Sequence, residues 1–191
     1  MNTSSYQILS EDQLQKVGNT IIYLCDRIKD LSKTKLLKLL YILDEISIKK
    51  HGIPFLNLKY KLWKYGPVSE EFFIDLSDEP ILLKDFVMFD NQYEFKIIKP
   101  NQSFNNDEFS KNDLQILDYV ISKFGDASAK NLNNYTHREN SPWHLTALKN
   151  NVLELLESEK INSTNIFIDM SLLIIHDEKK LEIYNDFLES H

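Results

Sequence analysis

Five histidines are the side chains of this chain best suited to acid–base or metal chemistry: His51, His137, His144, His176 and His191. A helix directs two imidazoles at one metal ion when they are four residues apart. No pair has that spacing, since His137 and His144 are seven residues apart around an expected helix start. His176 precedes Asp177 and Glu178 on an expected turn. We therefore expect histidines that are hydrogen-bonded or face solvent, and no metal site.

Other catalytic motifs are also missing. The chain contains no GxSxG, P-loop, GxGxxG or HExxH motif, and its 4 glycines could hardly form a nucleotide-binding loop. Adjacent carboxylates such as Glu70 and Glu71 point about 100° apart on a helix, whereas acid–base catalysis needs converging groups. The single Cys25 excludes an internal disulfide and a cysteine-rich zinc site, and its setting favours a small buried hydrophobe. We expect no enzymatic activity, no catalytic residue and no cofactor.

Aromatic residues gather near polar turns of the chain. They are Tyr41, Trp63, Tyr65, Tyr135 and Trp143. Tryptophan and tyrosine dominate binding hot spots because they bury a large area and keep a polar atom. The alternative is that both tryptophans are core residues, which their type alone favours.

The composition is that of an ordinary globular protein, with 191 residues, 42% hydrophobic and 27% charged. The first residues lack a basic segment followed by an apolar run, and no stretch approaches the roughly 20 apolar residues of a membrane span. These features predict a cytoplasmic protein with no membrane association. We expect a single domain over residues 1–191.

The net charge of −7 is unevenly distributed. Residues 1–64 carry 11 basic and 6 acidic side chains, a charge of +5, and residues 65–191 carry 11 and 23, a charge of −12. Only the segment from Lys33 to Lys64 could form a basic face for nucleic acid, so nucleic-acid binding is disfavoured. The acidic remainder is suited to a basic protein partner or is a solvated surface.

Helix signals recur along the chain. The first helix is expected from about Glu11 to Asp30, after Ser10 as N-cap. The second begins after Ser32 and ends at Gly52, and nine of its thirteen residues from Leu36 to Ile48 are apolar, which predicts a central helix. Further helices are expected to follow the caps listed here: Ser69, Ser110 with Asp113, Ser128, and Ser141 with Pro142.

Strand signals are fewer. Along residues 60–64, the side chains of Tyr60, Leu62 and Lys64 alternate with those of Lys61 and Trp63, which predicts a short extended segment before a turn at residues 65–68. Residues 86–89 and 93–98 flank a short loop, which predicts a β-hairpin. Residues 151–191 are expected to hold a helix at about 152–159, a short strand at 166–168 and an amphipathic helix. The sequence therefore predicts an α+β fold that is predominantly α-helical, a compact helical domain with a small antiparallel β-sheet.

Three blocks carry a resemblance to a known family. Residues 35–41 resemble the K-L-x-K-L-[LV]-Y helix of the Panacea antitoxin domain, and residues 62–68 are similar to its [AF]-W-x-[YH]-G-P-V segment. Residues 128–143 resemble its S-x-x-x-L…[LY]-[TS]-H…x-P-W ending. The resemblance covers roughly residues 15–150, a Panacea-like core, and leaves residues 151–191 as a C-terminal extension.

The resemblance to this SocA-like family implies an antitoxin of a toxin–antitoxin or phage-defence pair in bacteria, which neutralises its toxin by direct binding. The implied partner is a protein toxin encoded by the adjacent gene. Adaptor behaviour toward a cellular protease and DNA-binding autoregulation stay open, as does the oligomeric state. Residues 77–109 and 151–191, which depart from the motifs, could determine partner choice.

The candidate partner-binding residues are those of the motifs: Lys38, Tyr41, Trp63, Tyr65, Gly66, Pro67, His137 and Trp143. Of these, we expect Lys38, Tyr65, His137 and Trp143 to be displayed on the surface. The motif leucines and the Gly66–Pro67 pair are expected to determine the fold.

Overall fold

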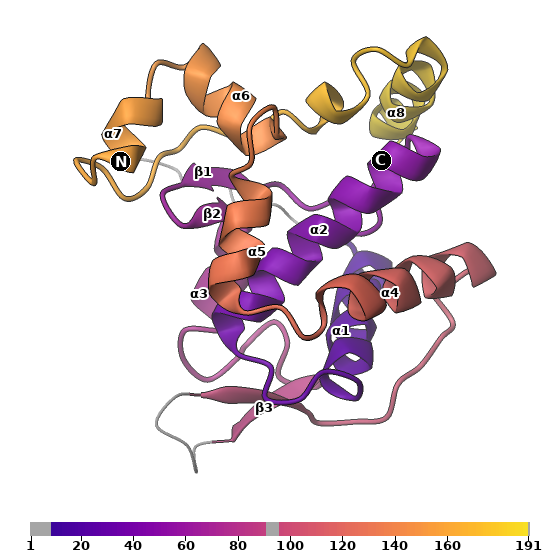
Figure 1. The fold of residues 1–191 in the computed structure, drawn as a ribbon. Coiled ribbons are helices and arrows are strands. Elements are labelled where there is room, and N and C mark those ends of the chain that lie inside the picture. The colour runs from indigo at the N-terminus through magenta and orange to yellow at the C-terminus, as the bar shows by residue number, and fades with distance from the viewer. Residues whose placement is uncertain (1–8, 91–95, 191) are drawn as a thin grey trace. The chain divides into compact units, whose positions relative to one another are not determined.

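The computed structural model describes residues 9–90 and 96–190. These residues form eight α-helices, one 3₁₀ helix and two antiparallel sheets of two strands each (Figure 1). The expected α+β class, predominantly helical with little sheet, is confirmed. Within the described residues, no helix is both long and apolar enough to cross a membrane.

Backbone contacts divide the chain into two compact units. Unit 1 comprises residues 1–37 and 69–126, and unit 2 comprises residues 38–68 and 127–191. All the candidate partner-binding residues belong to unit 2.

The elements of unit 1 are α1 (Glu11–Cys25), the start of α2 (Lys33–His51), α3 (Glu70–Asp75), β3 (Val87–Asp90), β4 (Ile97–Pro100) and α4 (Lys111–Phe124). The hydroxyl of Ser10 accepts the amide of Gln13 at 3.1 Å, which confirms the expected cap of α1. The helix ends at Cys25, so the expected end at Asp30 is wrong; Asp30 has a φ of 54°, outside the helical range.

The remaining caps of unit 1 agree with the sequence. Ser110 and Asp113 form a complete capping box at the start of α4. Ser69 occupies the N-cap position of α3, although its hydroxyl donates to the Glu71 carboxylate at 3.1 Å and makes no cap bond. Cap signals are reliable here because they act within three residues.

The core of unit 1 forms where α1 meets the β3–β4 hairpin and α4. The expected hairpin is confirmed by the pairing of Val87 with Pro100 and onward, whereas its connection, residues 91–95, lies outside the described residues. Gly18 lies against Phe86, and a Cβ there would come within 2.3 Å of the ring. The Tyr23 hydroxyl donates to Asp118 at 2.6 Å, which joins α1 to α4.

The elements of unit 2 are the rest of α2, β1 (Lys61–Trp63), β2 (Gly66–Val68), α5 (Ala129–Thr136), α6 (Pro142–Lys149), α7 (Leu153–Glu157), the 3₁₀ helix Met170–Leu173 and α8 (Glu178–Ser190). The hydroxyls of Ser128 and Ser141 cap α5 and α6, and Pro142 occupies the first turn of α6, as expected. Gly52, with a φ of 75°, follows the end of α2.

The α2 segment of unit 2 is its central element, because residues 39–43 are completely buried. The buried Asp44 carboxylate accepts the amides of residues 56–58 at 2.5, 3.2 and 3.3 Å and the Tyr60 hydroxyl at 2.7 Å. Burial is the largest effect and raises the pKa of Asp44 above its ordinary value, although these four hydrogen bonds partly offset the rise. This carboxylate therefore fixes the connection between α2 and β1.

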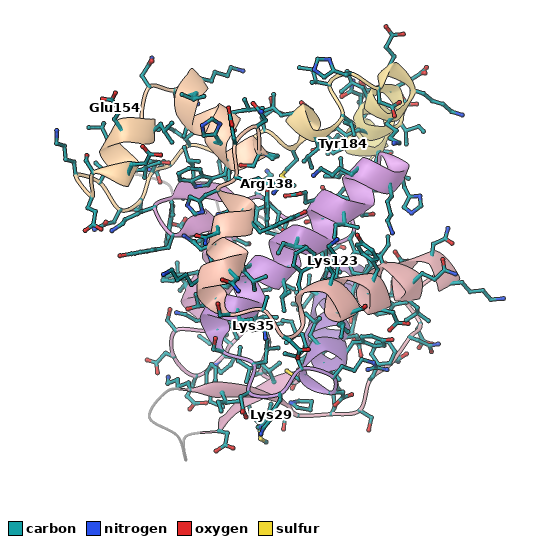
Figure 2. The ribbon with its side chains drawn as sticks, in the orientation of Figure 1. Lys29, Lys35, Lys123, Arg138, Glu154 and Tyr184 are labelled. Atoms are coloured by element: carbon teal, nitrogen blue, oxygen red, sulfur yellow. The ribbon has the colours of Figure 1, made fainter. Side chains whose placement is uncertain are left out.

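The C-terminal residues complete unit 2. Residues 162–168 run along β1. The Leu62 amide donates to the Ile166 carbonyl at 2.9 Å, and the Ile168 amide donates to the backbone carbonyl of Tyr60 at 2.8 Å. The strand expected at residues 166–168 is therefore present only as a single antiparallel bridge between Phe167 and Lys61. Figure 1 shows α8 beside the C-terminal end of α2, where burial raises the pKa of Tyr184, labelled in Figure 2, to about 12.

Candidate functional site

A two-residue turn, Lys64–Tyr65, joins β1 to β2, and Trp63 pairs with Gly66 across it. The turn expected at residues 65–68 is therefore misplaced, because residues 66–68 form β2. Gly66 has a φ of 107°, a conformation open to glycine and costly for residues with a Cβ. The hairpin thus ends in a tight tip formed by Lys64 and Tyr65.

Two aromatic side chains hold the backbone of this tip. The indole nitrogen of Trp143, from α6, donates to the carbonyl of Trp63 at 2.9 Å. The Nε2 atom of His137, at the C-cap of α5, lies 2.8 Å from the carbonyl oxygen of Lys64. The two rings also pack together, with centroids 3.9 Å apart.

A lysine holds the third carbonyl. The ammonium of Lys38, from α2, donates to the carbonyl of Tyr65, so that three consecutive carbonyls of the tip each meet a side chain. A Cβ at Gly66 would lie 2.9 Å from the Lys38 Nζ atom and 3.1 Å from the Thr136 hydroxyl. Glycine at this position is therefore favoured first by its φ angle, and a side chain there would also displace the Lys38 ammonium. Burial lowers the pKa of Lys38 to about 8.

His137 is placed between two acceptors. Its Nδ1 atom lies 2.7 Å from the Asn133 carbonyl oxygen, while Nε2 faces Lys64. A neutral imidazole can donate to only one of these oxygens, and an imidazolium can donate to both. Burial lowers the pKa of His137, the two carbonyls raise it, and the nearby Lys38 charge lowers it.

Tyr65 is the displayed residue of the tip, with 63% of its surface exposed. The Lys64 ammonium lies 4.6 Å from the centroid of the Tyr65 ring and donates to its hydroxyl at 3.1 Å. It also forms an ion pair with Glu159 at 2.7 Å. We call the three side chains that bind the carbonyls of residues 63–65, namely Trp143, His137 and Lys38, the clamp. The clamp binds the backbone carbonyl of Tyr65 and leaves the Tyr65 ring pointing outward.

Tyr41 lies in the core instead. It is completely buried, and its ring meets that of Tyr60 edge to face at 5.1 Å between centroids. Burial raises the pKa of the Tyr41 hydroxyl well above its ordinary value, and the neighbouring Glu45 carboxylate raises it further. A partner cannot reach this side chain in the folded protein.

The sequence analysis missed an ion cluster around Glu45. Its fully buried carboxylate accepts the Tyr135 hydroxyl at 3.0 Å, pairs with Lys49 at 2.8 Å and binds the guanidinium of Arg138, labelled in Figure 2. The four-residue spacing of Glu45 and Lys49 on a helix was a usable signal for one of these pairs. Arg138 gave none, because it lies 93 residues away in sequence.

The display expected of four motif residues is confirmed for one. Tyr65 is exposed, and His137 is half-buried. Lys38 and Trp143 are only 4% and 2% exposed, so their expected display is wrong: the turn carbonyls satisfy their polar atoms inside the fold. Trp63 is half-buried.

The expected structural role of Gly66 and Pro67 agrees with their burial. Pro67 pairs with Leu62 within the hairpin. For metal binding, the described residues contain no group of three His, Cys, Asp or Glu side chains that could hold an ion. His144, a residue considered for such a site, accepts the Asn140 amide at 3.3 Å through Nδ1.

One family model matches the chain: "Antitoxin SocA-like, Panacea domain", over residues 36–144. The match covers more than half of the 191 residues. It includes Lys38, the whole β1–β2 hairpin, His137 and Trp143. No curated protein and no solved structure matches the chain significantly.

Proposed function

The chain belongs to the SocA-like Panacea family of antitoxin domains, and from this premise we propose that it neutralises a protein toxin by binding it directly. The toxin is the product of the adjacent gene, and the hairpin tip is part of the contact surface. Among the motif residues, Tyr65 makes the contact, whereas Lys38, His137 and Trp143 hold the backbone of the tip.

The observation that carries this proposal is the clamp on three successive carbonyls. Side chains from α2, α5 and α6 fix the backbone of residues 63–65, while the Tyr65 ring stays exposed. An aromatic side chain on a rigid backbone is a favourable hot spot, because little conformational entropy is lost when it is bound.

Co-expression with the adjacent gene tests the proposal. The wild-type chain should restore growth to cells that express the toxin and should co-purify with it. The Tyr65→Ala variant should raise the Kd of the complex by about 30-fold, the effect of losing a hot-spot residue. Its unfolding free energy should stay near that of the wild type, since the clamp uses the backbone of residue 65.

The matched control is Tyr119→Ala, which removes a tyrosine from α4 that is 40% exposed. This variant should bind as the wild type does. Absence of both a complex and rescue by the wild-type chain would refute the proposed function. Equal affinity of Tyr65→Ala and Tyr119→Ala for the toxin would show that the hairpin tip is not part of the contact surface.

We consider two modes of neutralisation: occlusion of the toxin and delivery of the toxin to a protease. They differ in the fate of the toxin. We propose occlusion, so the toxin should persist at an undiminished level in rescued cells. A shortened toxin half-life that depends on a cellular protease would favour the adaptor mode instead.

The alternative of a DNA-binding autoregulator is weakened by how unit 2 uses its lysines. Lys38 is buried on the Tyr65 carbonyl, and Lys49 and Lys64 pair with carboxylates. These ammonium groups are therefore engaged within the protein rather than open to phosphates. Steep, salt-dependent retardation of the chain's own promoter DNA would reverse this judgement.

A further inference from the structure

The loop that follows α3 in unit 1 is built around one buried carboxylate. Asp75 is 8% exposed and accepts three consecutive amides: those of Ile81 at 2.7 Å, Leu82 at 2.8 Å and Leu83 at 3.1 Å. Hydrogen bonds to a charged acceptor are the stronger ones in proteins. The backbone at residues 81–83 is therefore held in one conformation.

The start of the same loop is also fixed. The Lys33 ammonium donates to the Ser77 hydroxyl at 2.8 Å, and that hydroxyl donates to the Phe73 carbonyl at 2.6 Å. The Lys96 ammonium donates to the Ser77 carbonyl at 3.3 Å. Pro80 further restricts the chain between the two anchored points.

This fixed loop turns apolar side chains outward. Leu83 is fully buried and anchors the loop, but Ile81 is 78% exposed and Leu82 is 42% exposed. Ile81 is the most exposed of the large apolar side chains in the part of the chain that the structure describes. A single exposed apolar residue is ordinary, whereas two in succession on a backbone held by three hydrogen bonds are suited to anchor a partner.

The charges beside this pair define the partner further. Residues 77–85 carry three carboxylates, from Asp78, Glu79 and Asp85, and one ammonium, from Lys84. All three carboxylate residues are exposed, and the Asp78 side chain is 97% exposed, with the Lys96 ammonium 4.0 Å away. An apolar pair with an acidic surround is complementary to an apolar pocket with a basic rim.

We propose that residues 77–85 are a second toxin-binding surface, at which Ile81 and Leu82 enter an apolar pocket rimmed by lysine or arginine residues of the toxin. This inference rests on the proposed antitoxin function. It is independent of the hairpin tip, since the loop lies in unit 1 and the tip in unit 2. The antitoxin thus contacts its toxin through two separately built surfaces.

The test is the affinity of purified Ile81→Asp for the product of the adjacent gene. This variant should raise the Kd by about 30-fold or more and should fail to restore growth, because it places a charge in an apolar pocket. Its thermal midpoint should match that of the wild type, since the side chain is 78% exposed. The matched control is Ile175→Asp, at a 52% exposed isoleucine of unit 2, which should bind as the wild type does.

A double charge reversal tests the acidic surround. Asp78→Lys combined with Glu79→Lys should lower the association rate by about tenfold at low salt and weaken its dependence on ionic strength. Wild-type binding by Ile81→Asp would overturn the inference and leave the antitoxin function intact. Failure of the wild-type chain itself to bind or rescue would refute both.

Discussion

The indole nitrogen of Trp143 donates to the backbone carbonyl of Trp63, and the two tryptophans lie 80 residues apart in sequence. This bond joins α6 to the last residue of β1. The donor side chain is buried, with Trp143 only 2% exposed, while Trp63 is half-buried. The two family motifs that contain these tryptophans are thus in direct contact in the folded protein.

The Trp143→Phe variant tests how much this hydrogen bond contributes to stability. Phenylalanine keeps an aromatic ring beside His137 but removes the donor, so the Trp63 carbonyl loses its side-chain partner. The free energy of unfolding should fall by about 0.5–1.5 kcal/mol, the net contribution of one hydrogen bond. Urea unfolding measures it, and toxin affinity should fall as well. An unchanged unfolding free energy would show that the indole N–H contributes nothing.

The His137 environment predicts a loss of stability at acid pH. Its pKa is lowered in the folded state, first by burial and also by Lys38, so the unfolded chain binds more protons as the pH falls through about 6.5. The unfolding free energy of the wild type should therefore decrease between pH 7.5 and 5 more steeply than that of His137→Gln. Glutamine keeps one donor for the Lys64 carbonyl. Parallel pH profiles of the two proteins would contradict the prediction.

Lys38 predicts a pH dependence of the same sign at alkaline pH, where stability rises as the pH rises. Its pKa is about 8 in the folded protein and 10.5 as a model value, so between these limits the unfolded chain binds the additional proton. The unfolding free energy of the wild type should rise relative to Lys38→Met by up to about 1.4 kcal/mol per pH unit. Unfolding in urea at pH 7.5, 9 and 10 measures the difference. A constant difference across this range would show that Lys38 is not buried as a cation.

Local signals account for what the sequence predicted correctly. The caps Ser10, Ser110, Ser128 and Ser141 all lie where the sequence placed them, because a cap is determined by three or four neighbouring residues. The end of the first helix was missed by five residues, since no glycine or proline marks Cys25 as its last residue.

Long-range contacts account for what was missed. Lys38 and Trp143 have polar atoms, which favoured display, but both are buried on backbone carbonyls that lie 27 and 80 residues away in sequence. Residue types show which side chains can donate a hydrogen bond. They do not show which backbone carbonyls, distant in sequence, will lie near those donors in the fold. Tyr65 was identified correctly because it lies in the turn itself, where exposure is the rule.

Asp75 supports the last prediction, which concerns the order of the unit 1 loop. In Asp75→Ala, the amides of Ile81, Leu82 and Leu83 lose their common acceptor. Hydrogen exchange at these amides should accelerate, and the unfolding free energy should fall by about 2 kcal/mol, because the buried Leu83 amide and two part-buried amides lose their acceptor. Asp78→Ala is the matched control, since its side chain is 97% exposed and it lies in the same loop. If both variants exchange alike, the Asp75 carboxylate does not order the loop, and the outward placement of Ile81 has another cause.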